Sequence, residues 1–205
     1  MLSSSRAVVF DLGAVLVDWD REHLYRELIP DPRRRAYFLD QVCPLSWNLE
    51  QDRGRPFSEG LAEREALHPE WRREIRAYWE RWDEMVVGAV PGMPDVVEEL
   101  AAQGVPLYAL TNFSAETYPR MPRRFPFFRH FRGVVVSGEE GVVKPDPEIY
   151  RRLESRFGLP PESLFFIDDV PANVETARNR GWGVHLFRGV EPLRRSLVAE
   201  GLLPA

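Results

Sequence analysis

Short runs of Val, Leu, Ile and Phe recur along the chain, separated by longer segments in which apolar and polar positions mix. The runs do not alternate with polar residues, which is typical of parallel strands covered on both faces. Between the later runs, apolar residues follow helical spacing up to Gly104, Gly158 and Gly181. The predicted strands are Ala7–Phe10, Val105–Leu110, Val134–Val136, Leu164–Ile167 and Gly183–Phe187, and the predicted helices are Pro94–Gln103, Pro145–Phe157 and Pro171–Arg180.

The segment between the first two runs has a different pattern. From Asp18 to about Gly88 no strand is predicted, and in WRREIRAYWERWDEM the residues Trp71, Ile75 and Tyr78 fall near one helical face. The alternation of strands and helices elsewhere predicts an α/β fold with a doubly wound parallel sheet and right-handed crossovers. We expect a core of residues 1–18 and 89–205 and a small α-helical cap of residues 19–88, with helices Arg21–Leu28, Pro32–Val42, Ser58–Leu67 and Pro69–Met85.

Composition narrows the class of protein. The 205 residues are 44% apolar, and the net charge of −5 argues against general binding to nucleic acids or anionic membranes. Cys43 is the single cysteine, so an internal disulfide is excluded and a reducing compartment is expected. MLSSSRAVVF lacks a signal-peptide pattern, and no apolar stretch approaches the roughly 20 residues of a membrane span. We therefore expect a cytoplasmic protein.

Lys144 is the only lysine in a chain that otherwise uses arginine for its basic residues. A compact ammonium differs from a planar guanidinium, because it presents a point charge on a flexible stem. The lone lysine therefore indicates a position where such a group is needed.

Polar groups follow four of the five predicted strands. Such strand ends meet at one edge of a parallel sheet, where ligand sites form. Each group alone is also typical of a helix cap or a turn. Together they suit one purpose, since carboxylates bind a divalent cation, an ammonium balances them, and hydroxyl and amide groups bind anionic oxygens. The groups are Asp11, Thr111 and Asn112, Lys144, and Asp168, Asp169 and Asn173.

Four motifs in this chain, FDLGAVL, LTN, VKPDPEIY and FIDDVPAN, resemble in content and order those of the haloacid dehalogenase-like hydrolase superfamily. The likeness is greatest to phosphatase-type members, which include the N-terminal phosphatase domain of soluble epoxide hydrolase and bacterial sugar-phosphate phosphatases. The helical insertion resembles the family's cap. The resemblance implies a Rossmann-like parallel sheet in strand order 5-4-1-2-3, with strands one and four side by side.

The resemblance also implies roles for the motif residues. Asp11 is the nucleophile and a metal ligand, and Gly13 offers its backbone carbonyl to the metal. Thr111 and Asn112 hold the transferred group, and Lys144 neutralises the nucleophile and the substrate oxygens. Mg²⁺ suits such a site, because it accepts few carboxylates, keeps waters and bridges to phosphate.

The two aspartates of the fourth motif divide the remaining roles. Asp169 and Asn173 have the four-residue spacing that is common in the family, so Asp169 is predicted as the direct metal ligand with Asn173 in support. Asp168 is expected to be a catalytic residue that supports Lys144 or a metal-bound water.

Gly13 departs from the phosphatase pattern Asp-x-Asp. In the family the second aspartate protonates the leaving oxygen and then activates water, and general acid–base help is worth roughly 10²–10⁴-fold in rate. Our first hypothesis is a Mg²⁺-dependent phosphatase of a small phosphorylated metabolite, of the sugar-phosphate class, that forms an aspartyl-phosphate. Its leaving group is activated, or another group replaces the aspartate. The candidates are Asp18, Asp20 and, in the cap stretch WNLEQDRGR, Asn48, Glu50, Asp52 and Arg53.

Two other hypotheses stay open. A 2-haloacid dehalogenase-type enzyme would attack carbon and displace a halide or a strained amine, with Trp19, Trp47 and Arg53 around the leaving group. The metal-binding form of FIDDVPAN argues against it. A catalytically silent binding protein would not be expected to keep its only lysine in the motif. For the small-molecule substrate of a monomer or homodimer, the predicted binding residues are Trp19, Trp47, Asn48, Arg53 and Asn112.

Overall fold

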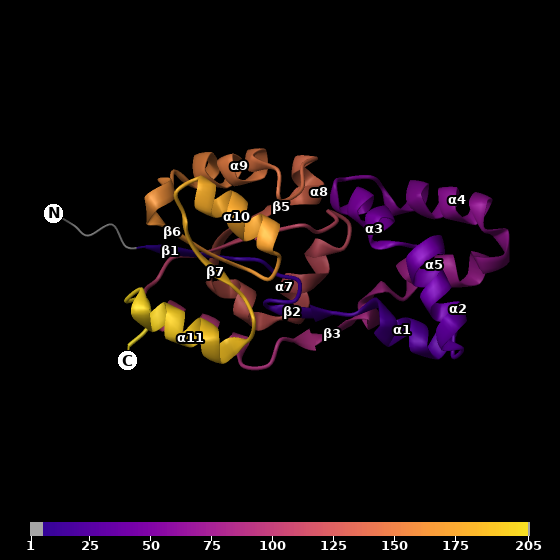
Figure 1. Ribbon diagram of the computed structural model, residues 1–205, viewed down its shortest axis with the longest axis horizontal. Helices are drawn as coiled ribbons and strands as arrows, with labels where there is room; N and C mark the ends of the chain where they lie inside the picture. The colour runs from indigo at the N-terminus through magenta and orange to yellow at the C-terminus, as the bar shows by residue number, and fades with distance from the viewer. Residues whose placement is uncertain (1–5, 205) are drawn as a thin grey trace.

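A five-stranded parallel sheet lies at the centre of the larger part of the molecule (Figure 1). The structure is a computed structural model that describes residues 6–204, so the ends of the expected core, 1–5 and 205, lie outside the described residues, as does the first half of MLSSSRAVVF. The strands run in the order β5-β4-β1-β6-β7. They are β1 (Ala7–Phe10), β4 (Leu107–Thr111), β5 (Phe131–Val136), β6 (Leu164–Asp168) and β7 (Gly183–Leu186).

This order agrees with the expected one. Counted within the sheet alone, β1, β4, β5, β6 and β7 are strands one to five, and the order read from β7 is 5-4-1-2-3. Strand β1 pairs in parallel with both β4 and β6, with Val9 opposite Tyr108 and Phe166. The pairing brings the ends of β1, β4 and β6 together at one edge of the sheet.

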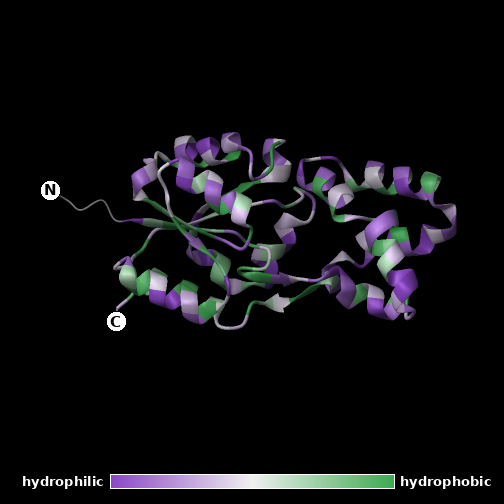
Figure 2. Cartoon of the chain, in the orientation of Figure 1, coloured by the Kyte–Doolittle hydropathy of each residue, from purple (hydrophilic) through white to green (hydrophobic). Residues whose placement is uncertain are grey.

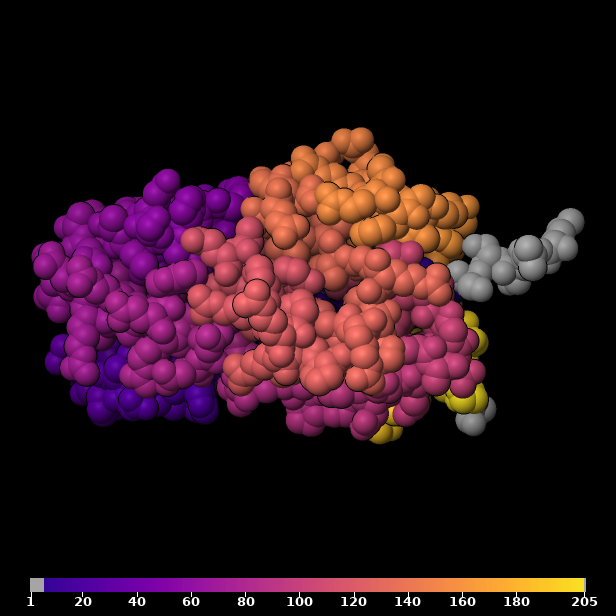
Figure 3. All heavy atoms as spheres, turned by 180° about the vertical axis from the view of Figure 1, so that it is seen from behind, coloured from indigo at the N-terminus to yellow at the C-terminus, as the bar shows by residue number. Residues whose placement is uncertain are grey.

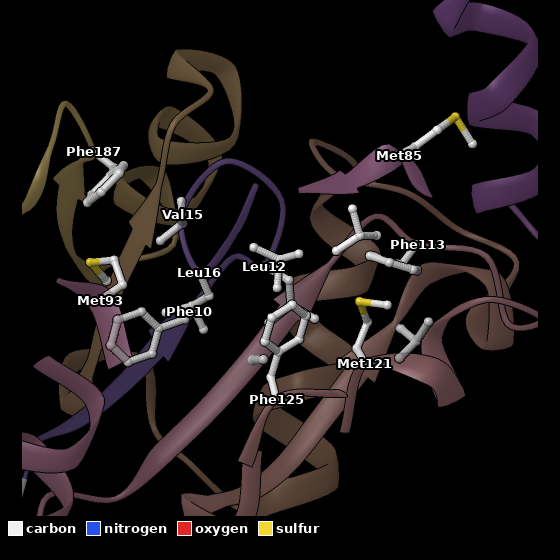
Figure 4. Close-up of a cluster of buried hydrophobic side chains, with 14 of the residues drawn as sticks. Phe10, Leu12, Val15, Leu16, Met85, Met93, Phe113, Met121, Phe125 and Phe187 are labelled. Atoms are coloured by element: carbon white, nitrogen blue, oxygen red, sulfur yellow. The ribbon is translucent and has the colours of Figure 1, made fainter. Parts of the chain in front are cut away.

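Both faces of the sheet are covered, as the uniform apolar runs predict. Val8 and Phe10 of β1 belong to a buried cluster that includes residues of α6 and α11, and Ala7 and Val9 belong to one that includes residues of α9 and α10. Figure 4 shows part of the first cluster, and the strands of the sheet are largely green in Figure 2. The core helices are α6 (Met93–Ala102), α7 (Met121–Arg124), α8 (Ser137–Glu140), α9 (Pro147–Phe157), α10 (Pro171–Asn179) and α11 (Val190–Ala199), with 3₁₀ turns η4 (Tyr118–Arg120), η5 (Pro126–His130) and η6 (Pro161–Ser163).

The helical insertion forms a separate part at one end of the molecule (Figures 1 and 3). Its interior is aromatic: Tyr78 lies 4.9 Å from Trp47 and 6.2 Å from Phe57, measured between ring centroids. The insertion contains α1 (Arg21–Leu28), α2 (Pro32–Tyr37), the π-helical turn η1 (Phe38–Val42), α3 (Leu45–Asp52), α4 (Phe57–Leu67), η2 (Pro69–Trp71), α5 (Arg72–Glu80) and η3 (Trp82–Met85).

Two short strands join the cap to the core, and their presence corrects the expectation of a strand-free segment. Strands β2 (Val17–Trp19) and β3 (Val86–Ala89) pair antiparallel, with Val17 opposite Ala89. Runs of three or four residues carry little periodicity, and each strand is specified by a partner that is distant in the sequence. The two crossings between core and cap are therefore held together by backbone hydrogen bonds.

Element boundaries shift by a few residues elsewhere. The predicted strand Val134–Val136 begins at Phe131, and the predicted helix Pro69–Met85 is divided into η2, α5 and η3. Helices α3, α7, α8 and α11 were not predicted. Within residues 6–204, no helix has both the length and the apolar character needed to cross a bilayer.

Candidate active site

Asp11 lies where β1 ends, at the edge of the sheet where β4 and β6 also end. Its backbone N–H donates to the carbonyl of Ile167 at 2.9 Å, which continues the β1–β6 ladder to the aspartate itself. The N–H of Leu12 donates to its Oδ1 at 2.7 Å. Asp11 is buried but not sealed, with 8% of its surface exposed. The carboxylate is held by the strand end and remains accessible.

Asp11, Asp168 and Asp169 form a cluster of three carboxylates. Each offers one oxygen, and these oxygens all lie within 4.8 Å of one another. Asp168 is fully buried at the end of β6, and Asp169 is half-buried one residue further on. The backbone carbonyl of Asp169 accepts a hydrogen bond from the Arg188 guanidinium at 2.8 Å. The end of the fifth strand thus also supports this edge, a contribution that the sequence pattern did not reveal.

Lys144 lies between two of these carboxylates. Its Nζ is 2.9 Å from Oδ1 of Asp11 and 2.6 Å from Oδ2 of Asp168. Burial alone would lower the pKa of Lys144, but the charges of Asp11 and Asp168 outweigh it and raise that pKa above its ordinary value. The ammonium therefore stays charged.

Asp168 is fully engaged in hydrogen bonds. Besides Lys144, its Oδ1 accepts from the N–H of Val170 at 2.8 Å, and the amide of Asn173 donates to both of its oxygens at 3.0 and 3.1 Å. The four-residue spacing associated Asn173 with Asp169, whereas the structure pairs its side chain with Asp168. The first turn of α10 turns the Asn173 amide back toward the end of β6. Asn173 acts on the cluster by fixing Asp168.

Thr111, the last residue of β4, and Asn112, the next residue, have different surroundings. Thr111 is fully buried, and its hydroxyl has no hydrogen-bond partner within residues 6–204. The side chain of Asn112 is occupied: its Oδ1 accepts from the N–H of Lys144 at 2.7 Å, and its Nδ2 donates to the carbonyl of Lys144 at 3.0 Å. Asn112 therefore fixes the lysine loop, a positioning role that was not predicted.

The cluster carries an excess of negative charge that one ammonium does not balance. Burial raises the pKa of Asp11 to about 7; Lys144 opposes this rise, and Asp168 and Asp169 add to it. Burial, together with the charge of Asp168, also raises the pKa of Asp169. Both shifts express the cost of holding adjacent carboxylates away from water. A bound cation would remove that cost.

The donor set fits a hard divalent cation. Carboxylate and carbonyl oxygens are the ligands that Mg²⁺ takes, and the cluster offers oxygen ligands only. Because Asp168 is saturated by Lys144, Val170 and Asn173, the oxygens of Asp11 and Asp169 are more readily available to a metal. The uncompensated charge and the oxygen donors both point to Mg²⁺ rather than to a soft metal.

A pocket lies next to this edge, between core and cap. Its volume is about 80 Å³, and its wall includes four aromatic side chains, those of Trp19, Phe57, Trp82 and Phe113. Of the residues predicted to bind substrate, Trp19, Asn48 and Asn112 line it. The core contributes Gly13, Asn112, Phe113 and Thr117, and the cap side contributes Trp19, Asn48, Asp52, Phe57 and Trp82.

Two predicted substrate-binding residues lie elsewhere. Trp47 is packed inside the cap with 2% of its surface exposed, and its indole N–H donates to the carbonyl of Gly60 at 3.2 Å. Arg53 is exposed and pairs with Glu50 at 3.1 Å. On α3 the side chains of Asn48 and Asp52, one turn apart, face the pocket instead. Phe57, Trp82, Phe113 and Thr117 were missed; only Phe113, directly after the LTN motif, carried a positional signal.

The family model for haloacid dehalogenase-like hydrolases matches residues 5–181, from the start of β1 to the end of α10. The chain belongs to the haloacid dehalogenase-like hydrolase family. Members of this family are hydrolases, and the match covers the whole cap and each of the four strand ends described above.

Three curated relatives are hydrolases or phosphatases by name. Flavin mononucleotide hydrolase 1 of Arabidopsis thaliana is 30% identical over 54% of this chain and 45% of its own length. Phosphoserine phosphatase of Thermus thermophilus is 31% identical over 68% of this chain and 56% of its own. A phosphorylated carbohydrates phosphatase of Thermotoga maritima is 24% identical over 85% and 81%. The match thus spans about half the length of the first two relatives.

Solved structures of two kinds share the fold. A family enzyme from Bacteroides thetaiotaomicron, in complex with magnesium and inorganic phosphate, has a TM-score of 0.69 and 22% identity, over 89% of this chain and 94% of its own. An L-2-haloacid dehalogenase from Xanthobacter autotrophicus, with chloropropionic acid covalently bound, has a TM-score of 0.60 and 22% identity, over 97% and 84%. At this identity the likeness establishes the fold alone.

Proposed function

We propose that the protein is a Mg²⁺-dependent phosphatase that transfers the phosphoryl group of a small phosphorylated metabolite, of the sugar-phosphate class, to Asp11. One observation carries the proposal: three carboxylates converge within 4.8 Å at the end of β1 and β6 while Lys144 neutralises only part of their charge. Attack at a halogenated carbon needs no metal, so it gives no reason for this cluster. The relatives named as phosphatases support the same choice.

The residues of the chain divide the work. Asp11 attacks phosphorus with a carboxylate oxygen, and Lys144 favours the ionised form of that carboxylate and faces the phosphoryl oxygens. The Thr111 hydroxyl, buried without a partner, is free to donate to one of those oxygens. Asp168 and Asn112 hold Lys144 by its ammonium and by its backbone. Water then hydrolyses the aspartyl-phosphate on Asp11.

Mg²⁺, held by Asp11, Asp169 and the carbonyl of Gly13, would supply positive charge for the phosphoryl oxygens. The saturation of Asp168 by its neighbours supports Asp169 as the direct ligand. The pocket supports a small metabolite as substrate rather than a polymer, because its volume is only about 80 Å³. Its aromatic wall would contact the part of the substrate that leaves.

The test is a panel of phosphate esters and 2-haloacids, assayed with Mg²⁺ or with EDTA for released phosphate and halide. We expect phosphate release that requires Mg²⁺ and is abolished in Asp11→Asn, which keeps the size of the side chain. Halide release that is insensitive to EDTA, with no phosphate release, would replace the proposal with a dehalogenase. Turnover of neither class would indicate a silent binding protein, and full activity of Asp11→Asn would exclude Asp11 as the nucleophile.

A further inference from the structure

Gly13 occupies the position where the phosphatase pattern has its acid, and the space beside it is open. A Cβ built on Gly13 meets no atom within 4 Å, and Gly13 lines the pocket between core and cap. The backbone does not exclude a side chain there. A proton donor for the leaving group must therefore reach the pocket from another element.

Asp52, the last residue of α3, lines the same pocket from the opposite side. The amide of Asn48 donates to its Oδ2 at 2.8 Å, and Oδ1 of Asn48 in turn accepts from the hydroxyl of Tyr78 at 2.9 Å. Tyr78 is fully buried in the cap, so this chain of hydrogen bonds ends at a side chain that is fixed by packing. The carboxyl group of Asp52 is held in one orientation, and Asp52 is half-buried.

The backbone of Asp52 is attached to the core. Its carbonyl accepts a hydrogen bond from the hydroxyl of Ser137, and the same Ser137 oxygen accepts from the N–H of Phe113 at 2.9 Å. Two residues later Gly54, at φ +108°, approaches the carbonyl of Gly138 so closely that a Cβ would lie 2.9 Å from that oxygen. The end of α3 therefore docks on the start of α8, which follows β5 directly and is itself bonded to the loop after β4.

The other acidic candidates are used elsewhere. Asp18 is exposed on β2. Asp20 caps α1, where it accepts from the N–H of Glu22 at 2.8 Å. Glu50 is directed toward Arg53, with which it pairs at 3.1 Å. Among Asp18, Asp20, Glu50 and Asp52, only Asp52 lines the pocket beside Gly13.

The surroundings of Asp52 favour its protonated form near neutral pH. Burial raises the pKa of Asp52 to about 7; the charge of Asp11 adds to this, and hydrogen bonds from the Ser114 backbone and the Asn48 amide oppose it. A general acid works best when its pKa lies near the operating pH. An ordinary exposed aspartate would already have lost its proton there.

We propose that Asp52 is the general acid and base of the reaction and takes the place that Gly13 leaves open; this rests on the proposed phosphatase function. In the first step a carboxylate oxygen of Asp11 bonds to phosphorus, the bond from phosphorus to the leaving oxygen breaks, and that oxygen takes the proton of Asp52. In the second step the Asp52 carboxylate takes a proton from water. The water oxygen bonds to phosphorus, the bond to Asp11 breaks, and phosphate leaves with Asp52 protonated again.

Leaving-group dependence tests the acid role. Phenol is a poorer leaving group than 4-nitrophenol and needs the proton more. We expect Asp52→Asn to lower kcat/KM about 10²-fold or more for phenyl phosphate and about tenfold or less for 4-nitrophenyl phosphate. With 4-nitrophenyl phosphate the variant should also release a burst of one nitrophenol per enzyme, because the aspartyl-phosphate then waits for a base. An equal loss on both esters, or none, would overturn the proposal.

Two further variants separate chemistry from folding. Glu50→Gln removes a carboxylate from the same helix and should leave both esters unaffected. Gly13→Asp in the Asp52→Asn background places an acid in the open space. We expect this double variant to have a kcat/KM for phenyl phosphate at least tenfold higher than that of Asp52→Asn alone. A thermal melt of Asp52→Asn within a few degrees of the parent shows that the comparison is of folded proteins. If the parent hydrolyses neither ester, the phosphatase function fails; if it hydrolyses both and Asp52→Asn matches it, only the role of Asp52 fails.

Discussion

Gly13 of the core and Asp52 of the cap line one pocket, although they belong to different parts of the fold. The loop after β1 begins with Asp11, the proposed nucleophile, and has Gly13 instead of a carboxyl group two residues later. The end of α3 carries a carboxyl group that the docking of the cap brings to the same place. Attack by Asp11 with proton transfer from Asp52 is possible only while the cap is docked on the core. Closure of the pocket is therefore coupled to proton transfer.

Magnesium should stabilise the fold through Asp169. Ligand binding to the native state alone raises stability by about 2.7 kcal/mol at a hundred times Kd. We expect millimolar Mg²⁺ to raise the Tm of the parent by several degrees and to leave the Tm of Asp169→Asn unchanged, as measured by calorimetry in the absence of substrate. Glu50→Gln, which removes an exposed carboxylate, is the control and should respond as the parent does. If Mg²⁺ raises the Tm of Asp169→Asn as much as that of the parent, Asp169 is not a metal ligand.

Replacing Thr111 should separate stability from activity. Its hydroxyl is buried and has no partner in the described part of the chain, and such a group costs about 1–3 kcal/mol. Thr111→Val keeps the shape of the side chain, so we expect its free energy of unfolding, measured by denaturant titration, to rise by about 1 kcal/mol. Phosphatase activity should fall at least tenfold. In the control Ser163→Ala, the lost hydroxyl donates to the carbonyl of Pro160 at 2.7 Å, and that variant should be less stable but fully active. A destabilised Thr111→Val would show that the hydroxyl has a structural partner.

Asp52 should make stability depend on pH. Because burial raises the pKa of Asp52 to about 7 from an unfolded value near 4, the native state holds a proton that the unfolded chain has lost. This cost is absent below about pH 4, grows up to about pH 7 and is complete above it. We expect Asp52→Asn in EDTA to be about 1–3 kcal/mol more stable than the parent at pH 8 and nearly equal to it at pH 4.5.

Urea titrations at both pH values measure this difference. The exposed Glu50→Gln should follow the parent at each pH. A constant offset between Asp52→Asn and the parent, at both pH values, would show that the Asp52 carboxyl has an ordinary pKa.

Gly54 should control the docking of α3. Alanine at this position would adopt φ +108° with strain and would place its Cβ 2.9 Å from the carbonyl oxygen of Gly138. We expect Gly54→Ala to lower kcat/KM at least tenfold, because the end of α3 must move and Asp52 moves with it. Gly104→Ala is the matched control: its φ is +74°, but its Cβ would meet no atom within 4 Å. That variant should lose stability only. Equal activity in the two variants would contradict the docking role.

The sequence predicted the strand ends well because a buried parallel strand is visible in the sequence as a short, continuous apolar run. Asp11, Thr111 and Asp168 each follow an apolar run, and the pairing of β1 with β4 and β6 brings their ends together. The motifs also identified Lys144, whose ammonium does lie between two carboxylates. These groups could be predicted because the chemistry and the strand that positions it are adjacent in the chain.

The sequence could not predict which cap side chains face the pocket. Trp47, Asn48 and Asp52 belong to α3, and Arg53 follows directly after it. The direction of these side chains depends on how that helix packs. The burial of Trp47 against Tyr78 directs Asn48 and Asp52 to the pocket and leaves Arg53 in solvent. The link of Asn173 to Asp168 rather than to Asp169 likewise depends on the orientation of the first turn of α10.

By itself, the sequence determined the α/β core, the helical cap, the order of the strands through its motifs, and the loop that begins with Asp11, the proposed nucleophile. These features depend on residues that are close to one another in the chain. The tertiary structure alone decided which cap carboxylate accompanies Gly13, because Asp52 reaches the pocket through the docking of α3 on Ser137 and Gly138. Contacts between distant segments depend on packing, and no local pattern of apolar and polar residues encodes them.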